Sequence, residues 1–113
     1  MKMTEIESTP DLTDAAACFA ALGSEQRLHV LKVLVRAGPD GLSIGELGER
    51  SGVTGSTLTH HMKLLAAAGL VQQVKEGRRV ICIGAAYERM QELSAFLLNE
   101  CCADAPEGGH DHG

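Results

Sequence analysis

The sequence predicts a mainly α-helical fold with a β-hairpin wing, a dimeric winged helix-turn-helix of order α-α-α-α-β-β-α. Two short helices separated by a tight turn are predicted over residues 44–68, and a hairpin follows directly over residues 70–83. The chain has 113 residues, which favours one domain with a small core that two copies share. We expect a flexible N-terminus over residues 1–10, the winged domain over residues 11–102, and a flexible Gly- and His-containing tail over residues 103–113.

Two helices are predicted before this central region. The first is Ala-rich, covers residues 11–22, is capped from around residues 9–10 and ends at Gly23. Ser24 opens the second helix, which continues until Gly38. Because short helices need a buried apolar face, the first helix is expected to pack partly against a second subunit.

The two central helices carry clear start and stop signals. Ser43 with Glu46 three residues later is the capping-box pattern, and Gly52 ends the helix that it opens. Thr54 can cap the next helix, which Gly69 ends. The apolar face of this helix is predicted to contain Leu58, Met62, Leu65 and Ala66.

The segments after the second central helix predict a wing and an interface helix. Strands over residues 70–75 and 79–83 are joined by a Gly-containing turn with arginines at its tip. Residues 85–102 are predicted to form the last helix, with an interface stripe at three- and four-residue spacing. The stripe consists of Tyr87, Met90, Leu93, Ser94, Leu97, Leu98 and Cys101.

The charge distribution favours a nucleic-acid partner although the net charge is −5. Residues 54–84 carry four basic and one acidic side chain and are the only net-positive segment, whereas acidic residues outnumber basic ones on both sides. A basic helix-turn-helix with a wing therefore predicts binding to double-stranded DNA. An acidic body suits a protein that discriminates against random DNA and needs a dimer for affinity.

Several segments together resemble the ArsR/SmtB family of bacterial winged-helix repressors. They are residues 19–31, 47–54, 59–71, with the run His-His-x-Lys-x-Leu, and the wing residues 75–79. The resemblance implies a homodimer that sits on an operator, blocks transcription and leaves when an inducer binds, and it does not imply an enzyme.

The DNA-facing residues follow from this resemblance by position. Short hydroxyl side chains and arginine forks suit contacts to base edges and phosphates. The predicted contacts are Thr54, Ser56, Thr57, Thr59, His60, Lys63, Arg78 and Arg79. His61 points about 100° away from His60 around the helix and is expected to be packed instead.

The inducer site is predicted from the cysteines. Many arsenic sensors of the family carry Cys-x-Cys at positions that are Ser43 and Gly45 here, and residues 85–102 contain no histidine for a helix-bound zinc site. Cys101 and Cys102 remain, adjacent thiols that can chelate one soft centre. We therefore expect As(III) or Sb(III) as the inducer, bound through this vicinal pair.

A third ligand is not evident. Cys18 on the first helix is a candidate across the dimer interface, or else a small buried hydrophobe, and Cys82 is expected to be packing. His110 and His112 could add nitrogen ligands, which would allow zinc or cadmium to bind, although such a tail is more often disordered.

Alternative functions stay open at this stage. A redox or persulfide-sensing repressor would use the same fold, and a small metal-carrying protein would use the Cys pair and the tail. A thiol enzyme lacks support, since no Cys-x-x-Cys is present. Four cysteines, no signal-peptide pattern and no long apolar run indicate a cytoplasmic chain that does not enter a membrane.

Overall fold

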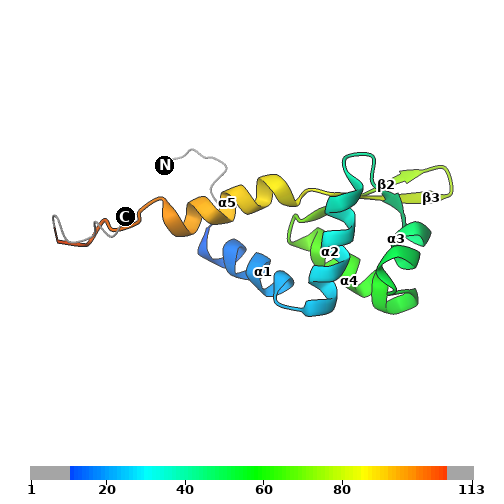
Figure 1. Ribbon diagram of the computed structural model, residues 1–113, viewed down its shortest axis with the longest axis horizontal. Coiled ribbons are helices and arrows are strands. Elements are labelled where there is room, and N and C mark those ends of the chain that lie inside the picture. Colours follow the sequence, from blue (N-terminus) through cyan, green and yellow to red (C-terminus); the bar gives the residue numbers. More distant parts are fainter. Residues whose placement is uncertain (1–10, 107–113) are drawn as a thin grey trace.

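The computed structural model describes residues 11–106 and has the predicted winged helix-turn-helix architecture (Figure 1). In chain order its elements are α1 (Leu12–Leu22), α2 (Glu25–Ala37), β1 (Leu42–Ser43), α3 (Ile44–Ser51), α4 (Gly55–Ala67), β2 (Val71–Glu76), β3 (Arg79–Gly84) and α5 (Ala86–Leu98). No helix in this part of the chain is long and apolar enough to cross a bilayer.

The first two helices begin at side-chain caps. The Asp11 carboxylate accepts a hydrogen bond of 2.7 Å from the backbone N–H of Asp14, and the Ser24 hydroxyl accepts one from Arg27. The cap of α1 is therefore Asp11 and not a residue around positions 9–10, which lie outside the described residues. The start of α2 at Ser24 is confirmed.

The capping box of α3 is present in full. The Ser43 hydroxyl accepts from the Glu46 N–H at 3.1 Å, and the Glu46 carboxylate accepts from the Ser43 N–H at 2.9 Å. Hydrogen bonds that the Glu46 carboxylate accepts from Ser43, first from its backbone N–H and then from its side chain, lower the pKa of Glu46. Gly52 ends α3 with φ 76°, a left-handed conformation that glycine adopts without the steric penalty of a Cβ atom.

The wing is larger than the sequence indicated. β3 lies in the middle of a three-stranded antiparallel sheet of order β1-β3-β2, with Leu42 opposite Cys82 and Glu76 opposite Arg79. The two-residue strand β1 was not predicted, because so short a segment has no periodicity of its own. By pairing with β3, β1 connects the base of the wing to the start of α3.

The core lies where α2, α3 and α4 meet one another and the inner face of β3. Leu34, Leu47, Leu65 and Leu70 are all fully buried there. Burial of each such side chain contributes about 1.5–3 kcal/mol. The apolar face predicted for α4 is confirmed by Leu58, Met62 and Leu65, and this packing fixes which side of α4 faces outwards.

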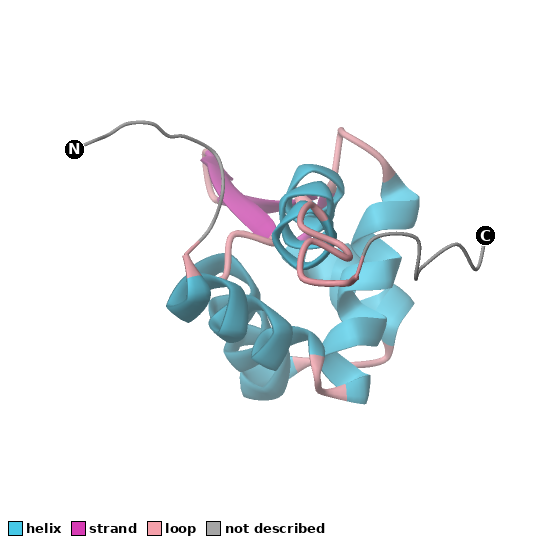
Figure 2. Cartoon of the chain, turned by 90° about the vertical axis from the view of Figure 1, so that its left-hand side faces the viewer, coloured by secondary structure: helices cyan, strands magenta, loops and turns pink. Residues whose placement is uncertain are grey.

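α5 runs from the base of the wing towards the opposite end of the molecule, and Figure 2 looks from that end along the helix. It ends at Leu98, so the prediction of a helix as far as Cys102 is wrong. Residues 99–106, which follow it, are exposed, and Asn, Cys and Asp have low helix propensity. Large apolar side chains on α1 and α5 remain exposed: Leu12, Phe19, Tyr87, Met90, Leu97 and Leu98.

Candidate nucleic-acid interface and thiol site

The outward side of α4 presents a row of polar side chains. Its inward side is buried through Leu58, His61, Met62 and Leu65, and the polar side chains face the opposite way. The residues that the sequence assigned to DNA contact are all exposed here: Thr54, Ser56, Thr57, Thr59, His60 and Lys63. The Thr59 hydroxyl donates to the Gly55 carbonyl at 3.3 Å, and its oxygen remains able to accept.

The N-terminus of α4 differs from those of α1, α2 and α3. Thr54 occupies the N-cap position, as predicted, but its side chain makes no capping hydrogen bond. No acidic residue lies in the first turn either. The first N–H groups of α4 thus have no side-chain partner from the cap and carry the positive end of the helix dipole.

His61 lies on the inner side of α4 and connects this helix to α2. Only 8% of this residue is exposed, and its Nε2 lies 2.9 Å from Oε1 of Gln26 on α2, which confirms that it is packed. Because Gln26 Oε1 accepts, Nε2 carries the proton, and the buried Nδ1 is left without a partner. Burial, with smaller contributions from Arg27 and His60, lowers the pKa of His61.

The wing carries its cations at exposed positions. Lys75 lies near the end of β2, Arg78 is at the tip, and Arg79 begins β3 opposite Glu76. None of the three forms an ion pair within the described residues. Their charges are therefore available to an anionic partner.

Cys101 and Cys102 lie in a turn after α5, both exposed, with their sulfur atoms 3.0 Å apart. A disulfide would bring the sulfurs to about 2.05 Å, so the two groups are free thiols. Cys102 has φ 69°, and the hydrogen bond with Cys101 raises the pKa of Cys102. The turn and the wing lie at opposite ends of the molecule (Figure 1).

The other predicted metal ligands are not brought to this pair. Cys18 in α1 and Cys82 in β3 are both fully buried, and burial raises the pKa of each thiol. Among residues 11–106 no three His, Cys, Asp or Glu side chains are grouped as a metal site. His110 and His112 lie outside the described residues. A third ligand from Cys18 of a second subunit stays a prediction.

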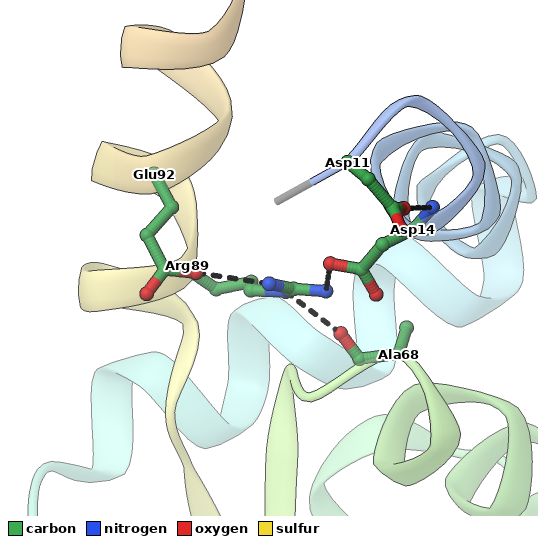
Figure 3. A network of polar contacts seen from close by, with 5 residues as sticks. All are labelled: Asp11, Asp14, Ala68, Arg89 and Glu92. Carbon is green, nitrogen blue, oxygen red and sulfur yellow. Dashed lines mark hydrogen bonds and ion pairs between the residues drawn. The ribbon is translucent and has the colours of Figure 1, made fainter. Parts of the chain in front are cut away.

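Arg89 of α5 is a polar residue that the sequence did not single out. It contacts α1, α4 and α5 at once, through Asp14, the Ala68 carbonyl and Glu92 (Figure 3). The signals in the sequence are that Arg89 is the only lysine or arginine after position 79 and that Glu92 follows it at i+3. Such isolation does not reveal partners that are up to 75 positions away in the chain.

The central part of the chain matches a known sequence family. Residues 22–74 match a family model described as a helix-turn-helix domain. A stretch of 63 residues is 38% identical to YceK of Bacillus subtilis, described as an uncharacterized HTH-type transcriptional regulator. This match covers 56% of the chain and spans 62% of the length of that relative.

Solved structures extend the likeness to most of the fold. The chain is 31% identical to reduced HlyU from Vibrio cholerae, with a TM-score of 0.57 over 76% of this chain and 90% of that one. An ArsR-like transcriptional regulator from Rhodococcus sp. RHA1 is 29% identical, with a TM-score of 0.64 over 81% and 82%. A homodimeric winged helix-turn-helix domain from Mycobacterium bovis shares the fold at 24% identity, with a TM-score of 0.61 over 90% and 89%.

Proposed function

We propose that this chain, which belongs to the ArsR family of winged helix-turn-helix transcriptional regulators, is a repressor that a thiophilic ion releases from its operator. The observation that carries the proposal is the exposed pair Cys101 and Cys102, with sulfurs 3.0 Å apart, in the same chain as an exposed basic reading head. We define the reading head as residues 54–79. In this scheme the protein acts in the cytoplasm, where thiols are kept reduced.

Three features support DNA as the partner of the reading head. Hydroxyl side chains line the outer side of α4, the N-cap side chain of α4 makes no capping hydrogen bond, and the wing cations form no ion pair with any of residues 11–106. Helix N-termini and basic side chains bind phosphates, and an exposed helix of this kind enters the major groove. The proposed contacts are Thr54, Ser56, Thr57, Thr59, His60, Lys63, Arg78 and Arg79.

The apolar residues of α1 and α5 support assembly as a homodimer. Leu12 is 73% exposed and Tyr87 is 76% exposed, and Leu97 and Leu98 lie near the end of the same helix as Tyr87. Water-exposed apolar side chains gathered on two neighbouring helices mark an interaction surface. The Mycobacterium bovis neighbour is homodimeric. Two reading heads related by two-fold symmetry would read half-sites about 34 Å apart.

The thiol pair supports As(III) or Sb(III) as the inducer. Each sulfur–arsenic bond that forms on arsenite replaces one As–OH group, and the thiol proton leaves with that hydroxyl as water. Soft sulfur donors select such soft centres. Both thiols are exposed at the surface, so the ion reaches them without opening the core. Zinc or cadmium would require further ligands, for which the described residues supply no cluster.

A repressor that responds to thiol oxidation is the second candidate. The 3.0 Å sulfur contact favours it, because closely placed exposed thiols are the ones that oxidants reach first. One solved neighbour is described as a reduced form, which points to the redox state of that protein. A bond between adjacent cysteines is strained, since their Cα atoms are about 3.8 Å apart. A partner thiol from Cys18 or from the second subunit is then needed.

Titration of the operator complex separates these candidates. The probe is labelled duplex DNA from upstream of the gene, with arsenite, cadmium, zinc or peroxide added in turn, the metals under reducing conditions. We expect arsenite to release wild-type protein and the matched variant Glu100→Gln, which changes the same turn but keeps both thiols. The double variant Cys101→Ser, Cys102→Ser should bind the operator equally well and stay bound.

Two results would overturn parts of this assignment. Release of the double serine variant by arsenite would show that the thiol pair is not the inducer site. Release of wild type by peroxide but not by arsenite would favour the oxidation sensor. A chain that does not bind its upstream DNA at all would contradict the repressor function itself.

A further inference from the structure

Arg89 joins the interface helices to the end of α4. Its Nε donates to the Ala68 carbonyl at 3.0 Å, one terminal nitrogen donates to Asp14 Oδ2 at 2.7 Å, and the other donates to Glu92 Oε1 at 2.9 Å (Figure 3). Ala68 is the C-cap of α4. One guanidinium therefore connects α1, α4 and α5.

The contact with Ala68 stabilises the C-terminal end of α4. The last carbonyls of a helix lack internal partners and carry the negative end of its dipole. α4 has no basic residue in its own last turn, so Arg89 supplies the cation from α5. Only 15% of the Arg89 side chain is exposed, and the hydrogen bonds to Asp14 and Glu92 raise its pKa. Arg89 therefore carries its positive charge at neutral pH.

α5 has few other attachments to the rest of the subunit. Ala86 and Leu93 are its buried residues, and most of its remaining side chains are at least partly exposed. Helices rise about 1.5 Å per residue, so Leu98 lies about 13 Å along the axis from Arg89. A change in the turn that holds Cys101 and Cys102 therefore acts on the end of α5 that has few contacts within its own subunit and that we assign to the dimer surface.

We propose that Arg89 is the positioning residue that couples the thiol pair to the reading head, an inference that rests on the function proposed above. When the two thiols close on a metalloid, the turn after Leu98 takes a new shape and α5 shifts. Arg89 moves with α5, and its bond to Ala68 is strained or lost because Asp14 on α1 also holds the guanidinium. The C-terminal end of α4 is then released, and the outer side of α4 no longer matches the groove.

The test measures coupling rather than affinity alone. Operator dissociation constants are determined with and without arsenite for wild type, for Arg89→Gln, and for Arg36→Gln, an exposed arginine of α2 as the matched control. We expect arsenite to weaken operator binding of wild type and of the control by about 5- to 150-fold. For Arg89→Gln we expect arsenite to change operator binding by less than about twofold, while arsenite still binds the DNA-free protein with wild-type stoichiometry.

Linkage supplies a second measurement. If arsenite weakens DNA binding by a given factor, DNA must weaken arsenite binding by the same factor. Wild type should show this reciprocal effect, and Arg89→Gln should bind arsenite equally well with and without DNA. A residue that only stabilises the fold would lower the unfolding midpoint but leave both ratios at their wild-type values.

The outcomes distinguish the two proposals. Should Arg89→Gln keep the wild-type ratio, the inference about Arg89 is wrong while the repressor function stands. Should wild type not be released by arsenite, the proposed inducer fails and the inference fails with it. If Arg89→Gln does not fold, the variant Arg89→Lys replaces it, since lysine keeps the positive charge but lacks the planar fork that contacts Ala68, Asp14 and Glu92 at once. A wild-type ratio in that variant would equally refute the coupling role.

Discussion

Removal of the two wing arginines should change how salt affects DNA binding. Arg78 and Arg79 are exposed, and neither forms an ion pair within the described residues. Without a direct ion pair in this part of the chain, both guanidinium groups can contact phosphates. We therefore compare wild type with the double variant Arg78→Ala, Arg79→Ala on the same operator duplex.

The magnitude follows from the number of exposed cations. Residues 54–84 hold four cations per protomer, so eight in a dimer. Each phosphate contact contributes about −0.9 to the slope of log K against log salt concentration, so eight contacts give a slope of about −7. The double variant removes four contacts from the dimer and should have a slope of about −3.6. Between 50 and 200 mM salt, wild type then loses about 150-fold more affinity than the variant does.

Fluorescence anisotropy at four or five salt concentrations measures these slopes. The matched control is Lys32→Ala, Arg36→Ala, which removes the same charge from exposed positions of α2, outside the reading head. We expect the control to keep the wild-type slope. A wing variant with an unchanged slope would refute phosphate contact by the wing, and an equal change in the control would show that only the overall charge matters.

Two further predictions concern the scaffold of the reading head. Leu65 of α4 is fully buried, so Leu65→Ala should lower the free energy of unfolding in urea by about 2–5 kcal/mol, and a loss below about 1 kcal/mol would contradict the described core. Because burial lowers the pKa of His61 below its ordinary value of 6.5, the unfolded chain binds protons more readily there. The stability that neutral His61 contributes is thus complete above pH 6.5 and is lost as the pH falls below that value. Unfolding measured at pH 7.5 and 5.5 should show a smaller decrease for His61→Gln than for wild type, and an equal decrease would contradict this assignment.

Local signals allowed most of the fold to be predicted. The cap at Ser24, the capping box of Ser43 and Glu46, and the left-handed Gly52 each act within a few residues and appear where the sequence placed them. The two sides of α4 also separate as predicted, because helical periodicity alone decides which side chains can reach a core.

The features that sequence reasoning missed depend on contacts across the chain. β1 exists because β3 pairs with it, and α5 ends at Leu98 because nothing packs on the residues that follow. Glu92 lies three residues after Arg89 on the same helix and is within reach of a local pattern, whereas Asp14 on α1 and Ala68 at the end of α4 are not. The adjacency of Cys101 and Cys102 in the sequence was enough to single them out. Their place in a turn beyond α5 was not predicted, because the last helix was expected to continue to Cys102.

For the repressor proposed above, the acidic body helps to explain how a modest inducer effect would suffice to release the operator. Residues 54–84 carry three net positive charges, and the rest of the chain carries eight net negative ones. Repulsion between this body and phosphate keeps non-specific affinity low, so binding depends on both reading heads docking together. A coupling free energy of about 1–3 kcal/mol between inducer and DNA changes the operator affinity by about 5- to 150-fold. In a protein with low non-specific affinity, the proposed small displacement of α4 would therefore be enough for release. A strongly basic protein with the same coupling would stay bound.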